Sequence, residues 1–215
     1  KIITLLLIIS FSFKTQNSLA QTGLVTPKAM VVSARVEASK IGSEIMKKGG
    51  NTFDAMVATE LALAVSFPYA GNIGGGGFMV YRKSNGEIGS LDYREKAPLA
   101  ASKNMFLDEK GNVIKGKSLE TALAIGVPGT IAGVFEVHKK LGSLPIEEIL
   151  KPVIELAERG VIVTKKQEIQ LKNHHEEIVK INGVKSLFSY AFKKNDTVKY
   201  PALAATLKRI SKNGR

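Results

Sequence analysis

The sequence predicts a layered α/β or α+β domain, and three observations lead to this prediction. Two helical segments come first, at residues 36–48 and 55–65. Asn85-Gly86 then separates two short apolar runs, which is the strongest short-range signal for a β-hairpin. Most of the chain after Thr130 has helical patterning. With 44% hydrophobic residues among 215, the chain has enough apolar material for one sizeable core.

The first two helices have recognisable ends. Ile41 and Ile45 share one face of the first, and Gly49-Gly50 provides its C-terminal stop. Thr52 is a suitable N-cap for the second helix. The negative charge of Asp54 in its first turn interacts favourably with the helix dipole. Residues 55–65 are apolar nearly all round, so we expect this helix to be buried.

The hairpin follows a glycine-rich run, Gly71–Gly77. A two-residue type I′ turn at Asn85-Gly86 sets the register. Apolar residues then face one another on one side of the sheet, Val80 opposite Leu91 and Phe78 opposite Tyr93. The same register places Arg94 beside Gly77.

The remainder is predicted to be mainly helical, with glycines as stops. Thr130 is a candidate N-cap for the first of these helices. The predicted ranges are 130–140 ending at Gly142, 146–159 ending at Gly160, 165–181, and 201–212.

Composition excludes several classes of site. The chain has no cysteine, which rules out disulfides, thiolate zinc sites and a cysteine nucleophile. His174 and His175 are adjacent and point in different directions on a helix, so we expect two surface residues and no metal site. The net charge of +12 comes from lysines scattered among acidic residues, so we expect no nucleic-acid partner. We also expect no cofactor.

The first twenty residues are typical of a secretory signal peptide. Lys1 precedes an apolar run at 2–13, and a polar stretch then ends in Ser18-Leu19-Ala20. The run of about twelve residues is too short to span a bilayer of about 30 Å as a helix, although an uncleaved anchor is the alternative. We expect a mature chain that begins near Gln21 and is periplasmic or secreted. Because the sequence lacks an initial Met and a clear final element, we expect it to be the front part of a longer protein.

The glycine run does not fit a nucleotide site. A phosphate-binding loop needs Gly-Lys-Ser/Thr at its end, but Gly77 is followed by Phe78-Met79. A dinucleotide fingerprint lies between a strand and a helix, and here the order is reversed. Two interpretations remain, a tight helix-to-strand crossing or a backbone that another group approaches closely.

Arg94 also has two interpretations. It can form an ion pair with Glu95 or Asp92. Alternatively, its guanidinium can hold a substrate carboxylate through two parallel hydrogen bonds.

Several spaced motifs together resemble the γ-glutamyltransferase family, also called γ-glutamyltranspeptidase or glutathione hydrolase. The resemblance runs from about Thr26 to Gly160. The motifs are Gly49-Gly50-Asn51, Asp54-Ala55, Ala70–Met79, Asp92–Pro98, Met105–Asp108, Gly126–Thr130 and Leu141–Pro145.

The resemblance implies an N-terminal-nucleophile hydrolase with an αββα sandwich, of which residues 21–215 are part of the large subunit. A family precursor cleaves itself, and the new N-terminal Thr of the small subunit attacks γ-glutamyl amides such as glutathione. Water, amino acids or dipeptides accept the γ-glutamyl group. Arg94 then binds the substrate α-carboxylate. No threonine here has the family's nucleophile context, so we expect no catalytic residue in this chain and no activity from it alone.

Two rival functions remain open. A cephalosporin acylase on the same scaffold would still use Arg94 for a carboxylate. A non-catalytic homologue of the large subunit would act as a binding or structural protein. Sequence beyond Arg215 distinguishes them from the transferase.

Overall fold

A computed structural model describes residues 23–215, so the predicted signal peptide at 1–20 lies outside the described residues. The chain divides into two units, Lys1–Met30 and Val31–Arg215. In the described part of the first unit, Thr26 donates a hydrogen bond from its hydroxyl to the carbonyl of Ala29. No helix within residues 23–215 is both long and apolar enough to cross a membrane.

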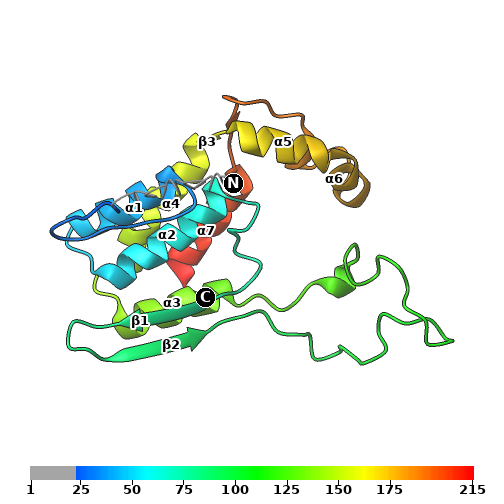
Figure 1. The fold of residues 1–215 in the computed structure, drawn as a ribbon, viewed down its shortest axis with the longest axis horizontal. Coiled ribbons are helices and arrows are strands. Elements are labelled where there is room, and N and C mark those ends of the chain that lie inside the picture. Colours follow the sequence, from blue (N-terminus) through cyan, green and yellow to red (C-terminus); the bar gives the residue numbers. More distant parts are fainter. Residues whose placement is uncertain (1–22) are drawn as a thin grey trace, which may run out of the picture. The chain divides into compact units, whose positions relative to one another are not determined.

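The second unit is an α+β structure whose core lies between helices (Figure 1). Helix α2 (Thr52–Ser66) packs against α1 (Val36–Lys47), α3 (Thr130–Leu141) and α4 (Ile146–Arg159). Helix α4 in turn packs against α7 (Pro201–Asn213). These contacts place α2 at the centre of the helical layer.

Helix α2 is buried on most sides, as its composition predicts. Val57, Leu61 and Val65 are fully buried, and the alanines between them are buried as well. The predicted cap is wrong: Asn51, not Thr52, is the N-cap. The side-chain oxygen of Asn51 accepts hydrogen bonds from the backbone N–H groups of Phe53 and Asp54. The backbone N–H of Asn51 in turn donates to the carboxylate of Asp54. Thr52 therefore begins the helix instead of capping it.

The hairpin of β1 (Phe78–Arg82) and β2 (Ile88–Asp92) exists, but its predicted register is wrong by one residue. Phe78 faces Asp92, and the last pair before the loop is Lys83 with Glu87. The loop has three residues and ends at Gly86, whose φ is +89°. Asn85 does not have a positive φ, which a type I′ turn would require.

The shifted register exchanges the two faces of β1 relative to β2, because side chains alternate along a strand. Met79 and Leu91 form the inner pair and pack against the helical core. Phe78 and Val80, predicted on the buried face, are 63% and 84% exposed. Figure 1 shows the hairpin beside α3.

The later helices match the predicted ranges with two corrections. Gly129 precedes α3 as its N-cap residue, so Thr130 is its first residue and not its cap. The predicted helix at 165–181 is two helices, α5 (Lys165–Asn173) and α6 (His175–Asn182), which meet at His174. Asn and His are weak helix formers, and neither helix has a buried residue that would hold the junction straight.

Short elements complete the unit. A small antiparallel sheet pairs β3 (Val161–Ile162) with β4 (Thr197–Val198), and patterning did not predict it because each strand has two residues. Two single-turn 3₁₀ helices are η1 (Ala122–Ala124) and η2 (Leu187–Ser189).

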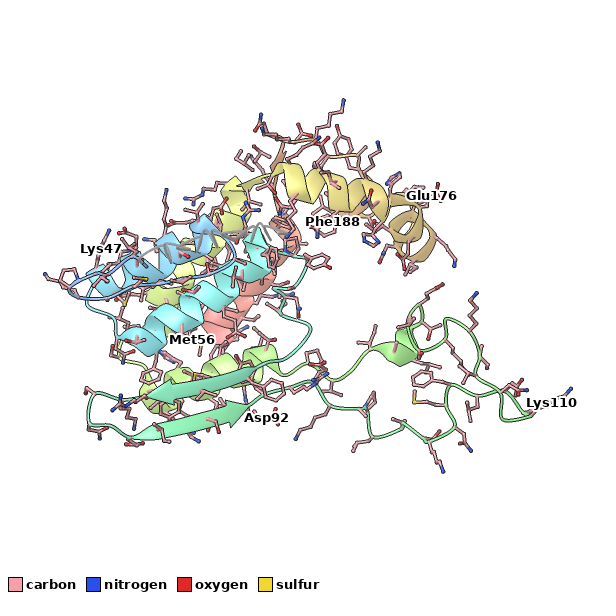
Figure 2. The ribbon with its side chains drawn as sticks, viewed as in Figure 1. Lys47, Met56, Asp92, Lys110, Glu176 and Phe188 are labelled. Atoms are coloured by element: carbon pink, nitrogen blue, oxygen red, sulfur yellow. The ribbon has the colours of Figure 1, made fainter. Side chains whose placement is uncertain are left out.

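Residues 97–126, which we call the arm, have little regular structure. An antiparallel bridge between Lys96 and Val127 holds the two ends of the arm together. Farther out, a second bridge joins Leu107 to Val113 around a turn. Most arm residues are exposed. In Figure 2, Lys110 labels this turn and Asp92 labels the end of β2, close to the base of the arm.

Candidate functional site

Three of the motifs found in the sequence meet at the base of the arm. The glycine run pairs with the residue after β2, since Tyr93 N–H donates to the Gly77 carbonyl at 3.0 Å and Gly77 N–H donates back at 3.4 Å. Lys96, just before the arm, pairs with Val127, just after it. The Lys96 N–H donates to the Val127 carbonyl at 3.1 Å, and the Val127 N–H donates to the Lys96 carbonyl at 2.7 Å. The structure therefore brings together segments that are about fifty residues apart in the chain.

The glycine run also completes the start of α3. Gly129 N–H and Thr130 N–H both donate to the carbonyl oxygen of Gly75, at 2.7 and 3.0 Å. The first N–H groups of a helix have no partner inside the helix, and here no side chain caps them. The start of α3 thus approaches the backbone of the glycine run closely, and close approach by another group is one of the two interpretations that the sequence allowed.

Space is the reason for glycine at several of these positions. A Cβ atom at Gly76 would overlap the backbone of Arg94 and Glu95. A Cβ at Gly129 would overlap the carbonyl of Tyr93, and one at Gly133 would overlap the Tyr93 ring. Larger residues would push the strand end away from the glycine run and α3.

Arg94 lies at this junction with an exposed guanidinium. Its side chain is 64% exposed, and its Nε lies 3.7 Å from Glu95 Oε1, beyond hydrogen-bond distance. The backbone N–H of Arg94, not its guanidinium, donates to Asp92 Oδ1 at 2.9 Å. Among residues 23–215 the guanidinium makes no hydrogen bond. An ion pair this long and exposed contributes little to stability.

The predicted neighbour of Arg94 is corrected by the register. Arg94 lies against Gly76, whereas Gly77 pairs with Tyr93. The sequence placed Arg94 beside the glycine run correctly, but one glycine too late. The loop has three residues instead of the predicted two, and this one-residue change in loop length accounts for the difference.

A pocket of about 330 Å³ opens beside Arg94. Arg94, Lys96 and Arg215 line it together with the first turns of α3, and Asp92 and Glu136 contribute negative charges. Three cationic and two anionic side chains leave the lining with an excess of positive charge, which suits an anionic ligand group. A guanidinium can hold a carboxylate with two parallel hydrogen bonds.

A second pocket, of about 390 Å³, lies away from these motifs. Val161, Leu171, Ile178, Phe188 and Tyr200 give it a mainly apolar lining. It contains none of the motif residues, so we place the candidate site at the Arg94 pocket despite its smaller volume.

Tyr93 and Glu60 form a half-buried pair next to Arg94 that the motifs did not single out. The Tyr93 hydroxyl donates to both carboxylate oxygens of Glu60, at 3.0 and 3.2 Å. Burial raises the pKa of Glu60, although the hydrogen bond from Tyr93 lowers it in part. Burial, and then the negative charge of Glu60, raise the pKa of Tyr93 above its ordinary value. A lone acidic residue in the middle of an apolar helix is the sequence signal that could have identified Glu60.

No candidate nucleophile with a free amine occurs in this part of the chain. Thr52 and Thr130 are both internal residues at the starts of helices. His174 is exposed and His175 is half-buried. Within residues 23–215 no three potential metal ligands cluster.

The fold and the junction of motifs define an α+β part of an N-terminal-nucleophile hydrolase of the γ-glutamyltranspeptidase type. A model of the Gamma-glutamyltranspeptidase family matches residues 38–215. The glutathione hydrolase proenzyme of Pseudomonas aeruginosa is 46% identical over 178 residues, covering 82% of this chain and 31% of that protein. The chain belongs to the γ-glutamyltranspeptidase family.

A solved structure shows the same arrangement. The γ-glutamyltranspeptidase of Helicobacter pylori is 42% identical with a TM-score of 0.85, covering 89% of this chain and 56% of that chain. A cephalosporin acylase from Bacillus halodurans, at 23% identity and a TM-score of 0.67, shares the fold alone. The chain spans about a third of the length of the curated relatives it matches.

Proposed function

We propose that this chain is part of a γ-glutamyltransferase, or glutathione hydrolase, that cleaves γ-glutamyl amides such as glutathione. The full-length protein would transfer the γ-glutamyl group to water, an amino acid or a dipeptide. Membership of the family supports this proposal, and so do relatives named glutathione hydrolase proenzyme at 41–46% identity. Because the chain covers about a third of such relatives, the activity belongs to the full-length protein.

Arg94 is the substrate-binding residue in this proposal, and the observation that carries it is its free guanidinium. The guanidinium projects at the junction of three family motifs and makes no hydrogen bond within residues 23–215. Its donors therefore remain available for the α-carboxylate of a γ-glutamyl group. The pocket of about 330 Å³ beside it offers space for that group.

The nucleophile in this proposal is an N-terminal Thr outside this chain. Self-cleavage of the precursor would expose it at the start of a small subunit, the partner of residues 21–215. Its hydroxyl attacks the γ-carbonyl and passes its proton to its own α-amine, and the amine then protonates the leaving group. The acyl-enzyme is released by water or by an acceptor amine.

We further propose that the protein is exported. The predicted signal peptide at 1–20 supports this, and cleavage would leave a large subunit that begins near Gln21. N-terminal sequencing of the large subunit purified from its host checks it. A cytoplasmic protein that still begins at Lys1 would contradict the proposal.

The rival functions have weaker support. The likeness to a cephalosporin acylase extends only to the fold, at 23% identity. A non-catalytic homologue would lack the self-cleavage Thr, so the sequence that follows this chain in the gene separates it from an enzyme.

Substitution of Arg94 in the full-length, self-processed protein tests the proposed function. Arg94→Lys keeps the charge but loses the planar fork, so one of two charged hydrogen bonds should go. Such a bond contributes about 1.5–3 kcal/mol. We therefore expect kcat/KM for glutathione to fall about ten- to hundredfold, and Arg94→Ala to lower it further.

A second substrate and a control variant make the test specific. A γ-linked anilide without the α-carboxylate should react almost equally with parent and variants. Arg82→Lys makes the same change at an exposed position of the same hairpin and should leave both substrates unaffected. Near-normal kcat/KM for glutathione in Arg94→Ala would show that Arg94 is only a surface ion-pair residue.

A further inference from the structure

Tyr93 is held on several sides although it lies at the end of a strand. Its backbone exchanges two hydrogen bonds with Gly77. Its ring fills space that glycines leave open: a Cβ at Gly77 would lie 2.7 Å from its Cε2, and a Cβ at Gly133 would overlap its Cγ. The strand, the glycine run and α3 therefore all restrict the position of this one residue.

The Tyr93 hydroxyl is fixed from a fourth direction by α2. Both carboxylate oxygens of Glu60 accept hydrogen bonds from it, and Glu60 lies in a helix whose central residues are mostly apolar. Within residues 23–215 no cation pairs with Glu60. Partial burial of a carboxylate without a cation carries a desolvation cost, and an apolar side chain there would serve stability at least as well. The pair is thus better explained by the geometry it imposes than by stability.

The fixed position of Tyr93 also restricts the backbone of Arg94, because one peptide bond joins the two residues. The Arg94 side chain has no hydrogen bond of its own within residues 23–215, so its placement depends on its backbone. Its Cα lies against Gly76, and its N–H is bound to Asp92. Movement of the Tyr93 ring toward α2, or away from it, would turn the guanidinium relative to the pocket.

We propose that Glu60 and Tyr93 are positioning residues that orient the Arg94 guanidinium toward the carboxylate of the substrate. This rests on the proposed function, in which Arg94 binds that carboxylate. A bidentate pair needs both of its hydrogen bonds aligned, so a small rotation weakens it. Displacements near 1 Å in substrate-positioning groups can lower rates by about a hundredfold. Loss of one hydroxyl should allow less movement than that.

The experiment uses the full-length, self-processed protein and removes one oxygen with Tyr93→Phe. We expect kcat/KM for a γ-glutamyl anilide to fall about tenfold, mainly through a higher KM. The matching anilide without the α-carboxylate should react as it does with the parent. Glu60→Gln keeps the size of the side chain and one acceptor oxygen, so it should give a smaller loss of the same kind.

A double-mutant cycle separates positioning from general structure. If Tyr93 acts through Arg94, adding Tyr93→Phe to Arg94→Ala should change nothing further. Tyr81→Phe is the matched control, because Tyr81 lies on the inner face of the same hairpin and packs edge-on against Phe53 at 5.4 Å. It should leave both substrates and both backgrounds unchanged.

Five outcomes would overturn the inference. Equal losses with both anilides, or a further loss in the Arg94→Ala background, would make the pair purely structural. Failure of both Tyr93→Phe and Glu60→Gln to fold or self-process would do the same. If Arg94→Ala itself treats the two anilides alike, the proposed function fails first, and the positioning role falls with it. If Arg94→Ala lowers kcat/KM only for the anilide with the α-carboxylate and Tyr93→Phe does not, only the positioning role is wrong.

Discussion

The helical core and the arm differ in how their order is maintained. In the core, Leu150, Leu156 and Val153 on α4 are essentially fully buried against α2 and α7. In the arm, Leu99, Leu119 and Val113 are at least 74% exposed. Side-chain packing therefore orders the core, whereas backbone bridges and turns order the arm.

Two aspartates make this difference concrete. Asp54 in the core accepts hydrogen bonds from the N–H of Asn51 and from the N–H and hydroxyl of Ser143, at 2.9, 3.0 and 2.6 Å. Asp108 in the arm accepts three bonds of similar length, from the N–H of Lys110 and from the N–H and side chain of Asn112. Asp54 is fully buried and joins α2 to a turn eighty-nine residues away, while Asp108 closes an exposed local turn. Similar hydrogen bonds thus have different consequences.

The largest stability effect should come from the buried side of the comparison. Leu150→Ala in the full-length protein removes a fully buried side chain and should lower the free energy of unfolding by about 2–5 kcal/mol. Denaturant titration followed by circular dichroism measures it. Lys110→Ala at the exposed turn of the arm is the control, with an expected change within about 0.5 kcal/mol. Equal losses in the two variants would break the comparison.

Substitution of the two aspartates tests the same difference between core and arm, with a smaller expected effect. Asp54→Asn should lower the free energy of unfolding by about 1–3 kcal/mol, because buried N–H donors lose a charged acceptor. Asp108→Asn is the matched change in the arm and should leave unfolding nearly unaltered, since water can replace the lost acceptor. A loss in Asp108→Asn as large as that in Asp54→Asn would show that burial is not the deciding factor.

The pH dependence of Asp54 has a definite sign. Burial by itself raises its pKa, but the hydrogen bonds from Ser143, and then from Asn51, outweigh burial and lower the pKa below its ordinary value. A depressed folded pKa contributes stability above the unfolded value, near pH 3.9, and this contribution is lost as pH falls through the folded value. The difference between parent and Asp54→Asn should therefore be constant near neutral pH and shrink in acid below about pH 4. A difference that grows in acid would contradict this.

Local sequence determined much of the secondary structure. Residues 146–159 form α4 with the predicted ends, because Gly160, at φ +89°, provides a stop that other residues adopt at a cost. The apolar composition of residues 55–65 predicted a buried helix, and α2 is buried. The spaced motifs identified the family, and the hairpin signal at Asn85-Gly86 placed Arg94 beside the glycine run.

Only the tertiary structure decided the register, the partner of the α3 N-terminus and the contact between Glu60 and Tyr93. Asn85-Gly86 fits either a two-residue or a three-residue loop, and the choice depends on which strand face the core accepts. The N-terminus of α3 is satisfied by the Gly75 carbonyl, a partner from a distant segment that no local rule could indicate. The contact between Glu60 and Tyr93 likewise joins residues thirty-three positions apart. Sequence patterns report local preferences, whereas these features depend on which distant groups the packed core brings into contact.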